Sequence, residues 1–495
     1  MTQLTPLEIL DADLDAIATA PGRVVVTVTP EGQLSAGAKR ANRLTKGAVA
    51  RLLESARFAK AKSGQVISLA WPTGMAAEAL DVLVLDKPVK ALPARKAGAA
   101  LGKLKSGKPM LVAASGISRA ADLAMGIVLR DYTFDTHKTA SDDTAEGDTT
   151  AVTLQHSKPE EVRAEAETLL AIAEGAHMTR DLTNEPANVL TTTEFANRLK
   201  EMEALGLEVE VLDDAALDKL GMRTLLSVGQ GSASPSYVVV MQWKGGAKDA
   251  APLALVGKGV VFDTGGISLK PAGGMEDMTM DMGGAGVVAG TMRALARRKA
   301  AANVVGLVGL VENMPSSTAT RPGDVVRSMK GDTVEIINTD AEGRMVLADV
   351  LWYAQDRFAP AAMIDLATLT GAIIIGLGHE NAGVFSNDDG LCNAFLKAAE
   401  TCGEGAWRMP LGSAYDDLLK SRIADMKNVG GRPAGSITAA QFLQRFVKED
   451  VPWIHLDIAG VASVKAETAF APKGATGWGV MALNQLVADR YESDT

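Results

Sequence analysis

The sequence predicts a soluble, multidomain protein of the α/β class, and three observations lead to this prediction. The chain has 495 residues, which is more than one compact core usually accommodates. Its composition is 47% hydrophobic and 22% charged, with 49 glycines and only 4% aromatic residues, so a large core is expected and intrinsic disorder is not. Short apolar segments alternate with segments of helical periodicity along most of the chain, which is the pattern of βαβ units.

The first third of the chain has the rhythm of a small α/β domain. β-branched apolar segments predict four strands, at 24–28, 66–70, 82–85 and 110–113. Helical periodicity predicts three helices, at 48–59, 94–105 and 120–130. The polar segment 135–150 then interrupts the pattern. We therefore expect a small, mostly parallel sheet that helices cover.

A long amphipathic segment follows and predicts a helix from Pro159 to about Thr183. We expect this helix, residues 158–183, to join a first domain of residues 1–157 to a second domain of residues 184–495. The second domain repeats the βαβ rhythm with predicted strands at 253–256, 304–310, 334–337, 362–366 and 454–458 and helices at 286–298 and 343–357. Strands that are apolar on both faces predict a doubly wound sheet.

The composition also restricts the surroundings of the protein. Only two cysteines occur, Cys392 and Cys402, so a disulfide framework is excluded and a reducing compartment is expected. The longest apolar run, 366–378, is shorter than the roughly 20 residues that a membrane-spanning helix needs. The first residues lack the basic and apolar segments of a signal peptide. We therefore expect a cytoplasmic protein without a membrane partner.

The net charge of −10 is unevenly distributed. Residues 1–134 contain 18 Lys and Arg against 11 Asp and Glu, so this part is basic and the remainder is strongly acidic. The segment 87–108 contains seven basic residues and no acidic residue. Such a segment binds nucleic acid in some proteins, but more often it is a solvated face of a helix and loop, which is the interpretation that we favour.

Charged residues gather after the predicted strands of the second domain. In open α/β sheets, ligands bind beyond the carboxyl ends of the strands. Three strand ends contribute here, those at 256, 337 and 366. The charged residues that follow the first two of them are Lys258, Asp263, Lys270, Asp281, Asp340, Glu342 and Arg344.

Carboxylates that crowd beside an apolar sheet are costly unless cations neutralise them. A charge of −4, which two divalent metal ions would balance, comes from Asp263, Asp281, Asp340 and Glu342. None of the five histidines lies in these segments, so the predicted site is rich in oxygen ligands. A pair of metal ions can activate a water molecule and polarise a carbonyl group. Lys270 and Arg344 then remain as cations for developing oxyanion charge.

Each of these residues has a simpler interpretation when it is taken alone. An acid after a strand, such as Asp281 or Asp340, is usually a helix N-cap. Lys258 lies between two glycines but lacks the spacing of a P-loop, and Gly229-Gln-Gly231 lacks the third glycine of a dinucleotide motif. His455 lies in an apolar strand, so we expect a hydrogen-bonded core residue. The joint occurrence of the charged residues is what favours a site.

The segment Asn338–Asp349, with the sequence NTDAEGRMVLAD, resembles the signature of the leucine (cytosol) aminopeptidase family. Other segments that are similar to blocks of this family are 180–188, 256–271, 281–285, 367–372, 436–440 and 455–460. Together they cover most of residues 180–480. Residues 1–157 match only in pattern, since relatives place there a small α/β domain that is similar to macrodomains.

The resemblance implies a two-metal aminopeptidase, which is a hydrolase and a metalloprotease. The readily exchanged metal would be bound by Lys258, Asp263, Asp281 and Glu342. The tighter one would be bound by Asp263, Asp340 and Glu342, with help from the backbone carbonyl of Asp340. Zinc or manganese is expected, with cobalt and magnesium as alternatives. The free amine of the substrate would bind one metal, so a metal-activated hydroxide would release one N-terminal residue from a peptide or amino-acid amide.

The resemblance also implies roles for residues that do not bind metal. Lys270 and Arg344 would be the catalytic pair, with a bicarbonate ion on Arg344 as the proton shuttle. The substrate side chain would contact Met278, Thr368, Gly371, Ala459 and Ala462. Some relatives carry methionine where this chain has Ala462, so we expect large apolar residues in general, and not leucine alone, to be accepted. Relatives are hexamers built as dimers of trimers, which implies a homohexamer.

Two further roles of the first domain follow from the resemblance. Some relatives bind DNA, and the basic segment 87–108 would then be the contact surface. The likeness to macrodomains implies a nucleotide pocket in residues 1–134. No glycine loop that cradles phosphate is apparent there, so we do not favour this role.

Overall fold

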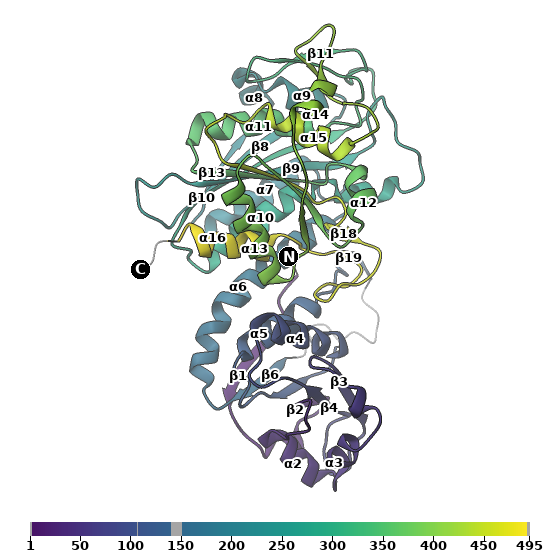
Figure 1. Ribbon diagram of the computed structural model, residues 1–495, viewed down its shortest axis with the longest axis vertical. Helices are drawn as coiled ribbons and strands as arrows, with labels where there is room; N and C mark the ends of the chain where they lie inside the picture. The colour runs from purple at the N-terminus through teal and green to yellow at the C-terminus, as the bar shows by residue number, and fades with distance from the viewer. Residues whose placement is uncertain (1, 106, 140–150, 493–495) are drawn as a thin grey trace. The chain divides into compact units, whose positions relative to one another are not determined.

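The computed structural model describes residues 2–105, 107–139 and 151–492. The chain divides into two compact units, one of Met1–Ala173 with Glu467–Pro472 and the other of Glu174–Ala466 with Lys473–Thr495 (Figure 1). Helix α6 (Pro159–Asn184) contains the division, where a linking helix is predicted. The predicted domain limits stay a prediction, and much of the predicted polar segment 135–150 lies outside the described residues. None of the described helices is long and apolar enough to cross a membrane.

The N-terminal unit contains a six-stranded sheet with the order β1-β6-β5-β2-β4-β3. Its strands are β1 (Leu7–Asp11), β2 (Arg23–Val28), β3 (Val66–Ala70), β4 (Ala79–Val84), β5 (Met110–Ala113) and β6 (Val152–His156). Neighbouring strands are parallel except for the antiparallel pair β3 and β4, so the mostly parallel sheet is confirmed. The sequence pattern does not predict β1 and β6, because β1 is short, contains two acidic residues and is largely exposed, and β6 directly follows the polar segment.

Helices cover both faces of this sheet (Figure 1). One face carries α4 (Ala91–Lys105), α5 (Ala120–Arg130) and the start of α6, and the other carries α1 (Ala16–Thr19), α2 (Ala36–Leu44) and α3 (Ala48–Leu53). The predicted helix 48–59 is wrong in length. It stops at Leu53 because the Ser55 hydroxyl donates a hydrogen bond to the Leu52 carbonyl and accepts one from the Phe58 N–H. These bonds replace the next helical turn.

The C-terminal unit contains an eight-stranded sheet with the order β15-β14-β17-β13-β9-β10-β8-β7. Its strands are β7 (Glu208–Leu212), β8 (Tyr237–Lys244), β9 (Leu253–Asp263), β10 (Asn303–Asn313), β13 (Ala362–Ala367), β14 (Ala382–Ser386), β15 (Ala406–Arg408) and β17 (Trp453–Asp457). The four central strands β10, β9, β13 and β17 are parallel to one another, so their carboxyl ends meet at one edge.

Helices on both faces of this sheet confirm the doubly wound α/β class (Figure 1). One face carries α9 (Arg223–Gly229), α11 (Gly343–Phe358) and α15 (Gly435–Gln444), whose apolar side chains share one core with the strands. The other face carries α10 (Gly283–Arg297), α13 (Asp389–Cys402) and α16 (Val480–Arg490).

Strand β9 continues well beyond its predicted end at residue 256. It reaches Asp263 because β10 pairs with it along its length, with Asn313 opposite Asp263. Lys258 therefore lies inside a buried strand, whereas the sequence predicts it after the strand. Gly257 allows this arrangement, because a Cβ atom there would lie 2.7 Å from the Cα atom of Ala285. The glycine lets the start of α10 pack directly on the strand.

The predicted strand 334–337 does not belong to the large sheet, so the prediction that its end contributes to the site as part of one sheet with the other two is wrong. Residues Thr333–Glu335 form β12 in a separate sheet with the order β11-β12-β16, in which β11 is Val325–Arg327 and β16 is Met426–Lys427. The loop from β12 to α11 therefore carries Asp340 and Glu342 to the edge of the large sheet from a second sheet. A strand of three residues has no periodicity that assigns it to a particular sheet.

Candidate active site

A cleft of about 530 Å³ in the C-terminal unit brings the predicted charged residues together. Three segments supply them, namely β9 with the loop after it, the 3-10 helix η3 (Met275–Met282) and the loop between β12 and α11 together with the first turn of α11. The charged residues that line the cleft are Lys258, Asp263, Lys270, Asp281, Asp340, Glu342 and Arg344. Asp281 and Asp340 are not helix caps, because α10 and α11 begin after Met282 and Glu342 without a side-chain cap.

Lys258 lies at the bottom of this cleft and is only 2% exposed. Its Nζ atom lies 2.7 Å from Oδ1 of Asp281 and 2.7 Å from Oε1 of Glu342, and it donates a hydrogen bond of 3.0 Å to the carbonyl of Thr368. Burial by itself lowers the pKa of this lysine, but Asp281, Glu342 and Asp263 outweigh burial and raise its pKa. These carboxylates therefore favour the protonated form of Lys258.

Lys270 lies nearer to solvent, with 21% of its side chain exposed. Its Nζ atom lies 2.7 Å from Oδ2 of Asp263 and also contacts Oδ1 of Asp340. Burial opposes the charge of Lys270, but Asp263 and Glu342 outweigh burial and raise the pKa of the lysine. The other oxygen of Asp263 accepts hydrogen bonds of 2.8 Å from the Gly265 N–H and from Nδ2 of Asn313. These bonds fix the carboxylate in the cleft.

The carboxylates of this cleft lie close enough together to hold a metal ion between them. Ligand oxygens of Asp263, Asp340 and Glu342 all lie within 4.8 Å of one another. Burial raises the pKa of Asp263, and the nearby charge of Glu342 adds to the effect. Oδ2 of Asp281 is buried and has no hydrogen-bond partner among the described residues. Buried oxygens of this kind are stabilised by a hard cation, which takes several oxygen ligands.

Arg344 lies in the first turn of α11 and is 6% exposed. One of its terminal nitrogens donates a 2.7 Å hydrogen bond to the backbone carbonyl of Asn428, and its Nε is buried with no partner within the described ranges. Burial lowers the pKa of Arg344 to about 10, so the side chain keeps its charge at neutral pH. The cleft therefore contains a fixed cation with a donor that the described residues leave unused.

Asn428 holds the loop that carries Asp340 and Glu342, a role that sequence reasoning missed. The side chain is fully buried. Its Oδ1 accepts hydrogen bonds from the Ile337 and Asn338 N–H groups, and its Nδ2 donates to the Asn338 carbonyl. Because its own carbonyl also accepts from Arg344, Asn428 connects the acidic loop to the arginine. A single asparagine in a loop of unpredicted structure carries no signal of this role.

We expect Asn428→Ala to lower kcat/KM by about 10–100-fold, the usual effect of removing a residue that supports metal ligands. The variant leaves the Ile337 N–H without its acceptor, so the acidic loop loses its fixed position. The measurement is activity as a function of metal concentration, because a displaced loop shifts the curve to higher metal. Asn484→Ala, which removes a buried asparagine on α16, is the control. Equal metal dependence in both variants would contradict the role of Asn428.

Four of the five predicted substrate-binding residues, Met278, Thr368, Gly371 and Ala459, line the same cleft. The fifth, Ala462, does not line it and is 6% exposed. A Cβ atom placed on Gly283 would lie 3.3 Å from both the Ala462 Cβ and the Thr368 Cγ2 atoms. The Ala462 and Thr368 side chains therefore both pack beside Gly283.

Asp457 lies in the block 455–460, and the sequence predicts no separate role for it. The carboxylate is fully buried at the end of β17. It accepts hydrogen bonds from the Leu369 N–H and from both the N–H and the hydroxyl of Thr370. Burial raises the pKa of Asp457, and these donors oppose the shift. Asp457 thus fixes the loop that carries Thr368 and Gly371.

The prediction that His455 is a hydrogen-bonded core residue is confirmed. His455 is fully buried, and its Nδ1 forms a 2.6 Å hydrogen bond with Asp365. Cys392 and Cys402 are buried free thiols.

A doubly wound α/β fold whose cleft collects four carboxylates, two lysines and an arginine fits a metal-dependent hydrolytic enzyme. Residues 177–484 match the cytosol aminopeptidase family, catalytic domain. The chain belongs to this family and is an aminopeptidase, so the resemblance that rests on Asn338–Asp349 is confirmed.

Individual relatives agree with this assignment. Probable cytosol aminopeptidases of Dinoroseobacter shibae and Cereibacter sphaeroides are 64% and 62% identical over 492 residues, which covers 99% of this chain and 100% of each relative. A mutant of tomato leucine aminopeptidase superposes with a TM-score of 0.85 at 29% identity, covering 98% of this chain and 96% of that one. The bottromycin maturation enzyme BotP in complex with Mn superposes with a TM-score of 0.80 at 34% identity, covering 95% and 99%.

Proposed function

We propose that this aminopeptidase depends on two divalent metal ions per subunit and releases single N-terminal residues, preferably large apolar ones, from peptides and amino-acid amides. The observation that carries this proposal is the cluster of Asp263, Asp340 and Glu342, whose ligand oxygens lie within 4.8 Å of one another. The buried Asp281 oxygen that has no partner among the described residues supports a second ion beside them.

The residues that would hold the readily exchanged ion are Lys258, Asp263, Asp281 and Glu342. Those for the tighter ion are Asp263, Asp340 and Glu342, together with the Asp340 carbonyl. When bound, such ions polarise a carbonyl group and lower the pKa of water. We favour zinc or manganese, with cobalt and magnesium as alternatives, and the complex of BotP with Mn supports manganese. Coordination by Lys258 requires that its amine first lose a proton.

We assign catalysis to the two remaining cations of the cleft. Lys270 keeps its proton, because Asp263 and Asp340 contact its ammonium, and it can donate a hydrogen bond to an oxyanion that forms beside it. Arg344 does not act as a general base at neutral pH, since its pKa stays near 10. We propose that it holds a bicarbonate ion as the proton carrier, and its buried Nε, which has no partner among the residues that the structure describes, supports an anion at this position.

A panel of aminoacyl-anilides tests the proposed function, with zinc, manganese, cobalt or magnesium added to the metal-depleted enzyme. We expect cleavage of leucyl, methionyl and phenylalanyl anilides and none of substrates with a blocked amine. Cleavage of blocked substrates, or equal activity without metal, would refute the proposal.

We expect Ala462→Met to narrow the same panel, at a cost to the bulkiest substrates of about 1–3 kcal/mol in transition-state binding. The longer side chain would need space beside Gly283, where Thr368, which lines the cleft, also packs. The measurement is kcat/KM for each substrate, with the thermal unfolding midpoint as a control for overpacking. An unchanged substrate profile in a folded variant would remove Ala462 from the specificity determinants.

We further propose a cytoplasmic homohexamer, as the resemblance implies. We do not propose DNA binding, because several residues of the basic segment 87–108 are engaged within the N-terminal unit. Arg95 pairs with Asp122 at 2.8 Å, and Lys105 pairs with Asp131 at 2.9 Å, all four side chains being largely buried. These pairs support the interpretation of an ordinary folded surface.

A further inference from the structure

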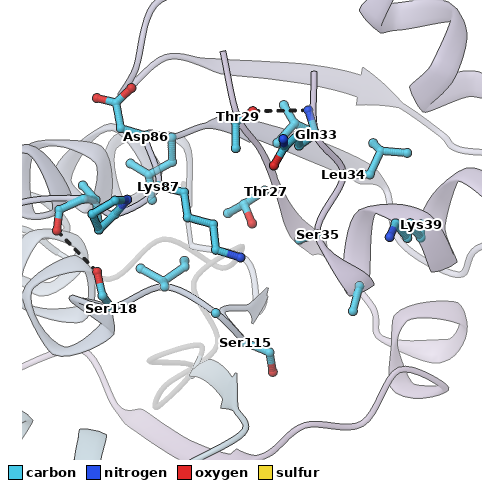
Figure 2. A pocket seen from close by; sticks show the side chains of 17 residues that line it. Thr27, Thr29, Gln33, Leu34, Ser35, Lys39, Asp86, Lys87, Ser115 and Ser118 are labelled. Atoms are coloured by element: carbon cyan, nitrogen blue, oxygen red, sulfur yellow. Dashed lines mark hydrogen bonds between the residues drawn. The ribbon is translucent and has the colours of Figure 1, made fainter. Parts of the chain in front are cut away.

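A second cavity, of about 430 Å³, lies within the N-terminal unit (Figure 2). Its walls are formed by the ends of three neighbouring parallel strands and the loops that follow them, at residues 27–29, 85–89 and 115–118, with the start of α2 alongside. Strand β2 lies between β4 and β5 in the sheet. The chain continues from β2 to α2 on one face of the sheet, and from β4 and β5 to α4 and α5 on the other face. Crevices at such carboxyl ends are where α/β sheets bind ligands.

The polar lining of this cavity is rich in hydrogen-bond donors that nothing in the described chain uses. Lys39 and Lys87 are exposed and have no ion-pair partner among the described residues, and Figure 2 shows Lys87 reaching into the cavity. The Thr27 side chain is 9% exposed, and its hydroxyl has no hydrogen-bond partner within the described ranges. Asp86, which is exposed, is the acidic residue of the lining. The cavity therefore carries a net positive charge and the hydroxyl of a largely buried threonine.

The loop between β5 and α5 adds backbone donors on the same side as Lys87. Gly116 has a φ angle of +90°, and a Cβ atom there would meet only Nζ of Lys87, at 3.9 Å. The N–H groups of Ser115 and Gly116 donate no hydrogen bond within the described part of the chain. Consecutive free N–H groups in a turn bind anions. A single glycine has no spacing motif, which is why no phosphate-binding loop is predicted from the sequence here.

We propose that this cavity binds a small phosphate-bearing molecule of nucleotide size. Lys87, the Thr27 hydroxyl and the loop at Gly116 would hold the phosphate, because these groups are donors and the lysine supplies opposite charge. A volume of about 430 Å³ lies in the range of small-molecule sites and exceeds what phosphate alone fills. Leu34 and Ile117 would contact the organic part. The proposal concerns the N-terminal unit and does not rest on the proposed function of the cleft.

Isothermal titration calorimetry of the full-length protein, without added divalent metal, tests the proposal with ADP, AMP, inorganic pyrophosphate and adenosine. We expect saturable binding of ADP, weaker binding of AMP and pyrophosphate, and no detectable binding of adenosine. Lys87→Ala should weaken ADP binding at least tenfold, and Thr27→Val about threefold. Lys90→Ala is the control. Lys90 carries the same charge and lies three residues after Lys87, but its side chain does not line the cavity.

Aminopeptidase activity and the unfolding midpoint show whether a variant remains folded. Lys87→Ala should keep both at the wild-type value. Lys39→Ala provides a second variant from the same lining. ADP that binds wild type and Lys87→Ala equally tightly must occupy another site, such as the catalytic cleft, and would overturn the proposal. Absence of binding by all four probes would overturn it as well. Pyrophosphate binding as tight as ADP would refute the contribution of the organic part.

Discussion

We expect Glu342→Ala and Asp340→Ala to abolish peptide hydrolysis and to lower the bound metal below that of the wild type. Both carboxylates belong to the three-residue cluster with Asp263, so either change removes a ligand oxygen from the same cavity. Glu342 is 4% exposed and lies 2.7 Å from Lys258, and its loss leaves that buried lysine with one carboxylate fewer. The measurement is elemental analysis of the purified variants together with anilide hydrolysis.

The control for this prediction removes a carboxylate of the same region that does not line the cleft. Asp277 lies in η3 and is paired only loosely with Lys465, at 3.5 Å. Asp277→Ala should keep both the metal content and the activity. Full metal occupancy in Glu342→Ala and Asp340→Ala would show that these residues are not ligands. After chelation, added metal should restore the activity of the wild type, whose ligand set is complete, but not the activity of Glu342→Ala or Asp340→Ala.

Lys270→Ala should keep its metal content and lose about 10²–10³-fold in kcat, the usual effect of removing an oxyanion donor. This lysine is the more exposed of the two, and its ammonium lies at the mouth of the cleft between Asp263 and Asp340. Its charge can therefore meet a substrate oxygen. The measurements are kcat at saturating substrate and the metal content of the variant.

Lys258→Ala should fail in a different way, with weakened metal binding that excess metal partly restores. Lys258 is buried between Asp281 and Glu342, where it can act on the metal ligands but has little access to a substrate. Metal titrations of the two variants therefore separate the two lysines. If excess metal rescues Lys270→Ala and not Lys258→Ala, the assigned roles are reversed.

Local patterns were sufficient to predict the fold class and most elements of the two sheets. Helix α5 and strands β3 and β5 occupy the residues predicted for them, because periodicity and β-branched content depend only on neighbours along the chain. Strand β9 shows the limit of this approach. Its extension to Asp263 depends on pairing with β10, whose partner residues lie about 50 positions away in sequence.

The sequence alone predicts that carboxylates and cations of the C-terminal unit belong to one site, because burying so many charges requires that they compensate one another. Which charges compensate which follows from the three-dimensional packing. It paired Lys258 with Asp281 and Glu342, and it brought the Asp340 loop from a second sheet. It also made Asn428 the support of that loop. Such contacts depend on how two sheets and a helix pack in three dimensions, and no local pattern along the chain encodes that packing.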